Sequence, residues 1–185
     1  FTDGTHKLIN FGIAAALRSA DGSGTESERR RSVLALEELG PDSIGGKAAS
    51  LVKDGGDDAA PVTGTIGYID PVCLRTMSLP DATSDLYSLG ATLYQCLAGD
   101  VPAVATRKAA GSSGVDAKVL IGDAAPVSVA EVASFAPADL VKLVDSLVAP
   151  SRDARPRSAD AVRRSLERIR SALAGHERAL PPESR

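Results

Sequence analysis

Four leucines recur at helical spacing within residues 84–99, SDLYSLGATLYQCLAG, at positions 86, 89, 93 and 97. This spacing places them on one face of a helix, and a face with so many large apolar side chains needs a core to cover it. Ser84 or Thr83 can cap the start of this helix, and Gly99 can end it. The stretch therefore predicts a buried helix, and with it a core built from helices.

Two more helices are predicted in the last third of the chain. Pro137 suits a first helical turn, and an apolar stripe follows it until Pro150 closes the helix. That stripe consists of Leu140, Leu143, Val144, Leu147 and Val148. Ser158 can cap a last helix with a core face and a mainly solvent-facing side. The core face is Val162, Leu166, Ile169 and Leu173, and the other side carries Arg163, Arg164, Arg168 and Arg170.

The rest of the chain is less strongly patterned. HKLI at 6–9 predicts a brief strand, and ESERRRSVLALEEL at 26–39 predicts a helix that stops before a Gly-Pro pair. Residues 41–61 are rich in Gly, Asp, Ser and Ala and predict a mobile surface loop, with LVK at 51–53 as a candidate ordered turn. Residues 100–130 predict loops around one short apolar run, VLI at 119–121.

Composition narrows the class of protein. A chain of 185 residues can form one domain with a sizeable core. A net charge of -3, with 3% aromatic residues and no Trp, gives no electrostatic footprint for nucleic acid. No apolar run reaches the roughly 20 residues of a transmembrane helix, and Cys73 and Cys96 lack metal or disulfide spacing. We expect a cytoplasmic protein. The only methionine is Met77, so we also expect further sequence upstream of Phe1.

Three phrases occur in a fixed order along the chain. They are KLINFGIA at 7–14, GTIGYIDPV at 64–72 with the leucine-striped helix after it, and DARPRSADAV at 153–162. Together they resemble the C-terminal lobe of a bacterial Ser/Thr protein kinase of the eukaryotic type, over about residues 3–174. The resemblance implies a mainly α fold, a kinase-like C-lobe fragment with a short N-terminal strand and three or more core helices. Residues 1–174 would be the domain, 13–63 a long activation segment, and 175–185 a linker or tail.

The resemblance gives Asn10 a specific meaning. In the family this position is the Asp of Asp-Phe-Gly, which holds Mg²⁺ against the ATP phosphates, and Phe11 and Gly12 keep the rest of the motif. An amide oxygen offers Mg²⁺ a dipole where a carboxylate offers a charge, so we expect a severe loss of phosphoryl transfer. Without the other motifs, Asn10 would read as a turn residue after a strand.

The segment GTIGYIDPV resembles the end of an activation segment. Thr65 would be the threonine that shapes the substrate-binding pocket, and Tyr68 and Pro71 also match the family. The family's Glu, which forms a buried ion pair with the residue matching Arg155, is replaced here by Val72. A buried unpaired guanidinium is costly. Asp70 is a candidate substitute acceptor, although the sequence leaves the direction of its side chain open.

Two further positions carry alternatives. Asp85 resembles the family's buried helix Asp, which accepts hydrogen bonds from the catalytic loop, but it also suits a simple first-turn acid favoured by the helix dipole. Ser32, after three arginines, and Thr63 are candidate phosphorylation sites in the long segment. For Ser32 the alternative is a solvated helix face with pairs such as Glu26 with Arg30.

No catalytic residue of the family is intact in this chain. It contains no His-Arg-Asp loop, no Gly-rich phosphate loop followed by a Lys strand, and no metal-binding Asp. By resemblance the cofactors are ATP and Mg²⁺ and the partner is a protein substrate or signalling protein, with an N-lobe supplied from upstream. We expect part of a Ser/Thr kinase domain that is inactive as this chain alone. The alternatives are a pseudokinase used as a binding or scaffold module, and a non-functional gene remnant.

Overall fold

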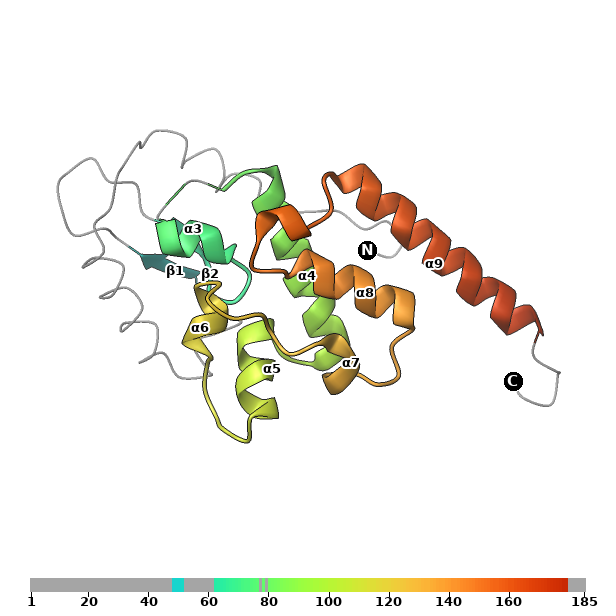
Figure 1. Ribbon diagram of the computed structural model, residues 1–185, viewed down its shortest axis with the longest axis horizontal. Coiled ribbons are helices and arrows are strands. Elements are labelled where there is room, and N and C mark those ends of the chain that lie inside the picture. The colour runs from blue at the N-terminus through green and yellow to red at the C-terminus, as the bar shows by residue number, and fades with distance from the viewer. Residues whose placement is uncertain (1–47, 52–61, 77, 79, 180–185) are drawn as a thin grey trace.

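The computed structural model describes residues 48–51, 62–76, 78 and 80–179. This part of the chain is mainly helical, as the sequence predicted, with a two-stranded sheet at one end (Figure 1). The strand predicted at 6–9 and the helix predicted at 26–39 lie outside the described residues. So do Asn10, Phe11, Gly12 and Ser32.

The two strands pair in antiparallel fashion before the helical core begins. β1 (Ala48–Leu51) pairs with β2 (Val62–Thr65), with Ala48 opposite Thr65. The prediction of a loop over 41–61, with an ordered turn at 51–53 as the exception, is therefore wrong at β1. A four-residue strand of mostly small residues, AASL, carries little strand signal of its own. A turn in which Tyr68 N donates to Thr65 O (3.1 Å) then leads into α3 (Pro71–Thr76).

The predicted central helix is confirmed as α4 (Ala82–Ala98). Its cap differs from the prediction, because Asp81 is the N-cap and accepts hydrogen bonds from the backbone N–H groups of Thr83 (2.9 Å) and Ser84 (3.0 Å). Gly99 ends the helix as predicted, with a φ of 83° that favours glycine.

The buried face of α4 is not centred on its leucines. Leu86 is buried, but Leu89 is 36% exposed, and the face is completed by small and aromatic residues. Those are Tyr87, Gly90, Ala91 and Tyr94. A Cβ on Gly90 would lie 2.5 Å from Leu147 Cβ, so the small residues let the neighbouring helix approach closely. The leucine spacing predicted the helix correctly. The face that α4 buries is rotated away from the predicted leucine face, toward Tyr87, Ala91 and Tyr94.

The region predicted as loop-rich, 100–130, holds three short helices. They are α5 (Pro102–Ala109), α6 (Ala117–Leu120) and α7 (Val129–Val132). α5 buries mostly proline and alanine rather than large side chains, and α6 and α7 are single turns capped by Asp116 and Ser128. None of the three therefore shows a recognisable apolar period.

The two C-terminal helices confirm the last part of the prediction in part. α8 (Ala138–Leu147) buries Leu143, Val144 and Leu147, and it is followed by the short 3-10 helix η2 (Arg152–Ala154). Ser158 caps α9 (Ala159–Ala179) through Ala161 N (3.2 Å). The predicted core face of α9 holds only near its start, because Val162 is buried while Leu173 is 47% exposed. In Figure 1 the last turns of α9 extend beyond α8.

From the sequence we expect no transmembrane helix in this chain. Within the residues that the structure describes, no helix combines the length and apolar character that crossing a membrane requires.

Candidate functional site

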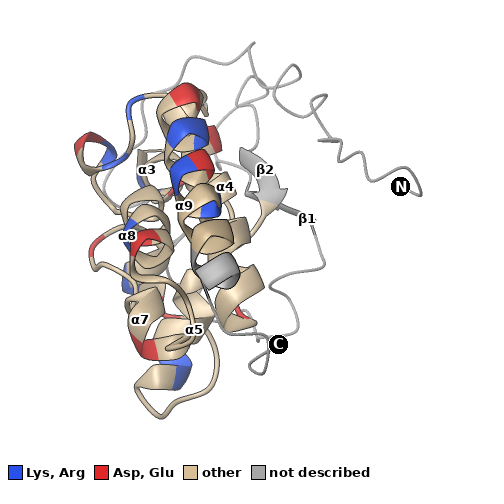
Figure 2. Cartoon of the chain, turned by 90° about the vertical axis from the view of Figure 1, so that its right-hand side faces the viewer, with Lys and Arg blue, Asp and Glu red and all other residues tan. Residues whose placement is uncertain are grey.

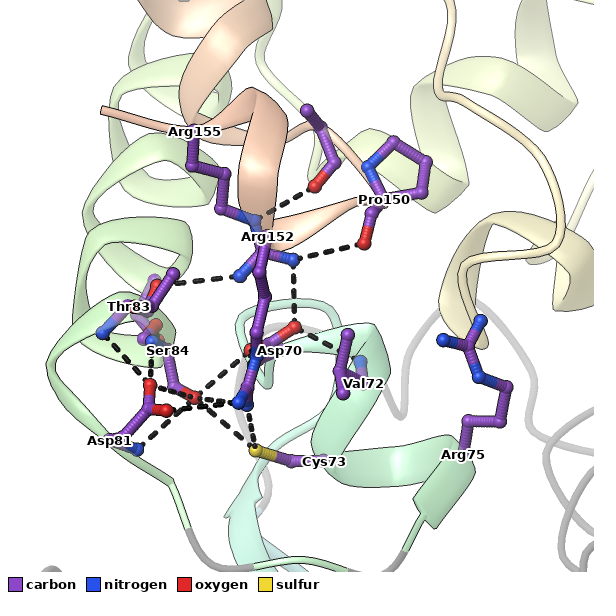
Figure 3. Close-up of polar contacts among 12 residues, drawn as sticks. Asp70, Val72, Cys73, Arg75, Asp81, Thr83, Ser84, Pro150, Arg152 and Arg155 are labelled. Carbon is purple, nitrogen blue, oxygen red and sulfur yellow. Dashed lines mark hydrogen bonds and ion pairs between the residues drawn. The ribbon is translucent and has the colours of Figure 1, made fainter. Parts of the chain in front are cut away.

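A buried ion pair joins two distant parts of the chain. Asp70 lies between β2 and α3, and Arg155 lies between η2 and α9. Asp70 Oδ1 and Arg155 Nη2 are 2.8 Å apart, and both side chains are fully buried (Figure 3). The Asp70 carboxylate therefore faces the arginine that the sequence left in need of a partner.

The remaining donors of Arg155 are directed at backbone carbonyls. Its Nε donates to Ala149 O (2.8 Å), Nη1 to Thr83 O (3.3 Å) and Nη2 also to Pro150 O (3.4 Å). The guanidinium carbon lies 4.9 Å from the centre of the Tyr87 ring, within range of a cation–π contact. A buried charge with a carboxylate, carbonyls and an aromatic face around it avoids most of the cost of burial.

Arg152 supplies a second guanidinium to the same carboxylate. Its Nε donates to Asp70 Oδ2 (3.0 Å), Nη1 to Asp81 Oδ2 (2.9 Å) and Nη2 to Ser84 Oγ (3.0 Å). The side chain is 28% exposed, so it closes the solvent side of the pair. Sequence analysis missed Arg152. The available signal was its place three residues before Arg155, since residues i and i+3 align in a 3-10 turn.

The pKa of Asp70 shows how this environment acts. Burial raises the pKa, but the hydrogen bond and charge of Arg155, the N–H of Val72 (3.0 Å) and the hydroxyl of Ser84 (3.0 Å) outweigh burial and lower it to about 2. Asp70 therefore remains a carboxylate at any physiological pH. We call Asp70, Arg152, Arg155, Asp81 and Ser84 the Asp70 cluster.

Cys73 borders the Asp70 cluster without adding a nucleophile. Its Sγ lies 3.3 Å from Ser84 Oγ and 3.4 Å from Arg152 Nη2, and the side chain is buried. Burial raises the pKa of this thiol, which keeps it protonated and unreactive.

The other predicted site residues within the described part of the chain do not belong to the Asp70 cluster. Thr65 is half-buried at the end of β2, and Thr63 lies within that strand. Val72 is half-buried and contributes its backbone N–H to Asp70. Asp85 is exposed in the first turn of α4, where the helix dipole favours an acidic residue.

The chemistry of the Asp70 cluster is that of an anchor. Its carboxylate oxygens are hydrogen-bonded on several sides by groups of the protein itself, which leaves no open position for a reacting atom. Among the described residues, no three His, Cys, Asp or Glu side chains gather where they could hold a metal ion. The cluster ties the start of α3, the start of α4 and η2 to one point.

Comparison of the sequence with models of known protein families gave no match, and comparison with curated proteins gave none either.

Proposed function

We propose that the chain is the C-lobe part of a Ser/Thr protein kinase domain. The observation that supports this most is the contact between Asp70 and Arg155. It joins residues 64–72 to residues 153–162, two of the three phrases that carry the kinase resemblance, where the family has an ion pair between those segments. The carboxylate comes from two residues earlier than in the family.

In this proposal the Asp70 cluster fixes the end of the activation segment to the helical core. A fixed segment end would hold Thr65, half-buried at the end of β2, where a protein substrate is to be recognised. Phosphoryl transfer from ATP to a protein Ser or Thr also needs a base, a phosphate-anchoring Lys and a metal-binding Asp. These 185 residues supply none of them intact, so the isolated chain would not catalyse transfer. ATP and Mg²⁺ would bind only together with an upstream N-lobe.

The second candidate is a pseudokinase that acts as a binding or scaffold module. Asn10 favours it, because the amide weakens Mg²⁺ binding where charge must be neutralised. The Asp70 cluster is equally compatible with a scaffold and with an enzyme, since both need a stably folded C-lobe. Both candidates place the protein in the cytoplasm, in keeping with the free thiols of Cys73 and Cys96.

The experiment starts from the reading frame upstream of Phe1. If that frame encodes a His-Arg-Asp loop and an anchoring Lys, the extended protein is assayed for transfer of the labelled γ-phosphate of ATP, with and without Asn10→Asp. We expect the substitution to raise transfer by roughly tenfold or more, since it restores the ligand charge. Unchanged transfer would contradict the metal role of Asn10. An upstream reading frame without those motifs would favour the scaffold function over the enzyme. Tight ATP binding by residues 1–185 alone, measured by calorimetry, would contradict the need for an N-lobe.

A further inference from the structure

A groove runs between α8 and α9, which lie side by side (Figure 1). Its α8 side is formed by Asp139, Lys142, Leu143 and Ser146, and its α9 side by Ser165, Arg168, Ile169 and Ala172, with Pro156 at one end. We call this the α8–α9 groove. It is separate from the Asp70 cluster, with which it shares no residue.

The floor of the α8–α9 groove is apolar. Leu143 is 7% exposed and Ile169 is half-buried, and both belong to the core cluster around Leu147. Ser146 Oγ donates to Leu143 O (2.7 Å), so its hydroxyl is directed at its own helix. A bulky apolar side chain from a partner would therefore meet hydrocarbon on the floor.

The rims of the α8–α9 groove are mainly cationic. Lys142 stands on α8 and Arg168 on α9, against one carboxylate, Asp139, whose contact with Lys142 is long (3.9 Å) and exposed. Arg168 Nη2 donates to Ser165 Oγ (3.1 Å), which uses one of the five N–H donors of its guanidinium. Two positive charges against one negative make the groove locally positive, although the whole chain has a net charge of -3.

The charges of α9 also indicate which partner fits. In Figure 2 charged residues line α9 near its start, and residues 171–175 are uncharged. Residues 159–175 carry four arginines and two acidic residues. A second copy of the chain that laid its own α9 in the groove would bring like charges together, which costs free energy.

We propose that the α8–α9 groove binds a protein segment in which acidic residues flank a bulky apolar side chain. The apolar side chain covers Leu143 and Ile169, and the acidic residues pair with Lys142 and Arg168. This inference goes beyond the proposed function and does not rest on it, because neither the groove nor its charge depends on the kinase resemblance.

The test uses two synthetic, fluorescein-labelled ten-residue peptides, one of Glu and Leu and one of Lys and Leu in the same order. Anisotropy with residues 1–185 should show saturable binding of the Glu–Leu peptide. Amide chemical shifts should move along α8 and α9. Arg168→Glu should weaken this binding about tenfold or more. Arg170→Glu makes the same charge change on α9 outside the groove and should stay within about twofold. Ala172→Trp, which fills the groove without changing charge, should also weaken binding. All three positions are exposed, and circular dichroism checks that each variant folds.

Four outcomes would overturn the proposal. The first is no saturable binding of the Glu–Leu peptide, and the second is stronger binding of the Lys–Leu peptide. The third is equal weakening by Arg168→Glu and Arg170→Glu, which would mean attraction to the charge of α9 as a whole. The fourth is self-association of the chain in sedimentation experiments that Ala172→Trp abolishes, which would make a second copy the occupant.

Discussion

The Asp70 cluster and the distal half of α9, from residue 170 onward, differ in what they bury. The cluster buries charged side chains, whereas distal α9 leaves an apolar side chain exposed. At the cluster, the charges of Asp70 and Arg155 are buried, and the two residues pair across 85 positions of sequence. On distal α9, the apolar Leu173 is 47% exposed although its spacing continues the core face. A residue's place in the sequence pattern therefore does not determine its burial. What decides is whether another element reaches that position.

The largest expected effect is at the buried pair. Asp70→Ala leaves Arg155 buried without its carboxylate, and we expect it to lower the free energy of unfolding by about 3–5 kcal/mol. Asp160→Ala removes an equivalent charge from the exposed pairs with Arg163 and Arg164 on α9 and should cost about 1 kcal/mol or less. Urea unfolding followed by far-UV circular dichroism measures both. Equal losses would remove the contrast between a buried and an exposed ion pair.

Substitutions at two glycines compare a closely packed position with an open one, without any change of charge. Gly90→Ala places a methyl group 2.5 Å from Leu147 Cβ, so α4 and α8 must separate, at a cost of about 1–3 kcal/mol. Gly175→Ala, on distal α9, meets nothing within 4 Å and should stabilise the helix by about 0.5–1 kcal/mol. Thermal unfolding of the two variants should therefore shift in opposite directions. A stabilising Gly90→Ala would mean that α4 and α8 pack less closely than described.

A pH titration gives a third contrast. The pKa of Asp70 falls from 3.8 to about 2 on folding, so the unfolded chain binds this proton more readily than the folded chain. The resulting stability, roughly 2 kcal/mol, is present above about pH 4 and is lost as the pH falls through about 2.

The matched variant for this titration is Asp70→Asn, which cannot titrate. The difference in unfolding free energy between the natural chain and this variant should shrink by roughly 2 kcal/mol between pH 5 and pH 2, while the exposed carboxylates cancel in the comparison. A difference that does not change with pH would show that Asp70 is not ionised against Arg155.

Sequence reasoning reached the parts of the fold that local patterns encode. α4, α8 and α9 carry large apolar residues at helical spacing with recognisable ends, and all three are present. α5 was missed because it buries mostly proline and alanine, and β1 because its four residues, AASL, carry little strand signal. The sequence could say that Arg155 needed an acceptor. It could not say that Asp70 turns inward, since that depends on the backbone after β2, where Gly67 adopts a φ of 99°.

The role of Arg152 could also not be predicted from the sequence. Its place three residues before Arg155 is the only local signal, and its role follows from the approach of η2 to the start of α4. Contacts between segments some 70 to 80 residues apart are set by the whole fold, so a site built from them is visible only once the fold is known.

We propose that Asp70 replaces the Glu that the kinase resemblance places at Val72. The most direct test compares the unfolding free energy of the natural chain, Asp70→Ala, and the double variant Asp70→Ala with Val72→Glu. If residue 72 occupies the family position, the new carboxylate can reach Arg155, and the double variant should recover about half or more of the stability lost in Asp70→Ala. A double variant no more stable than Asp70→Ala would contradict the claim.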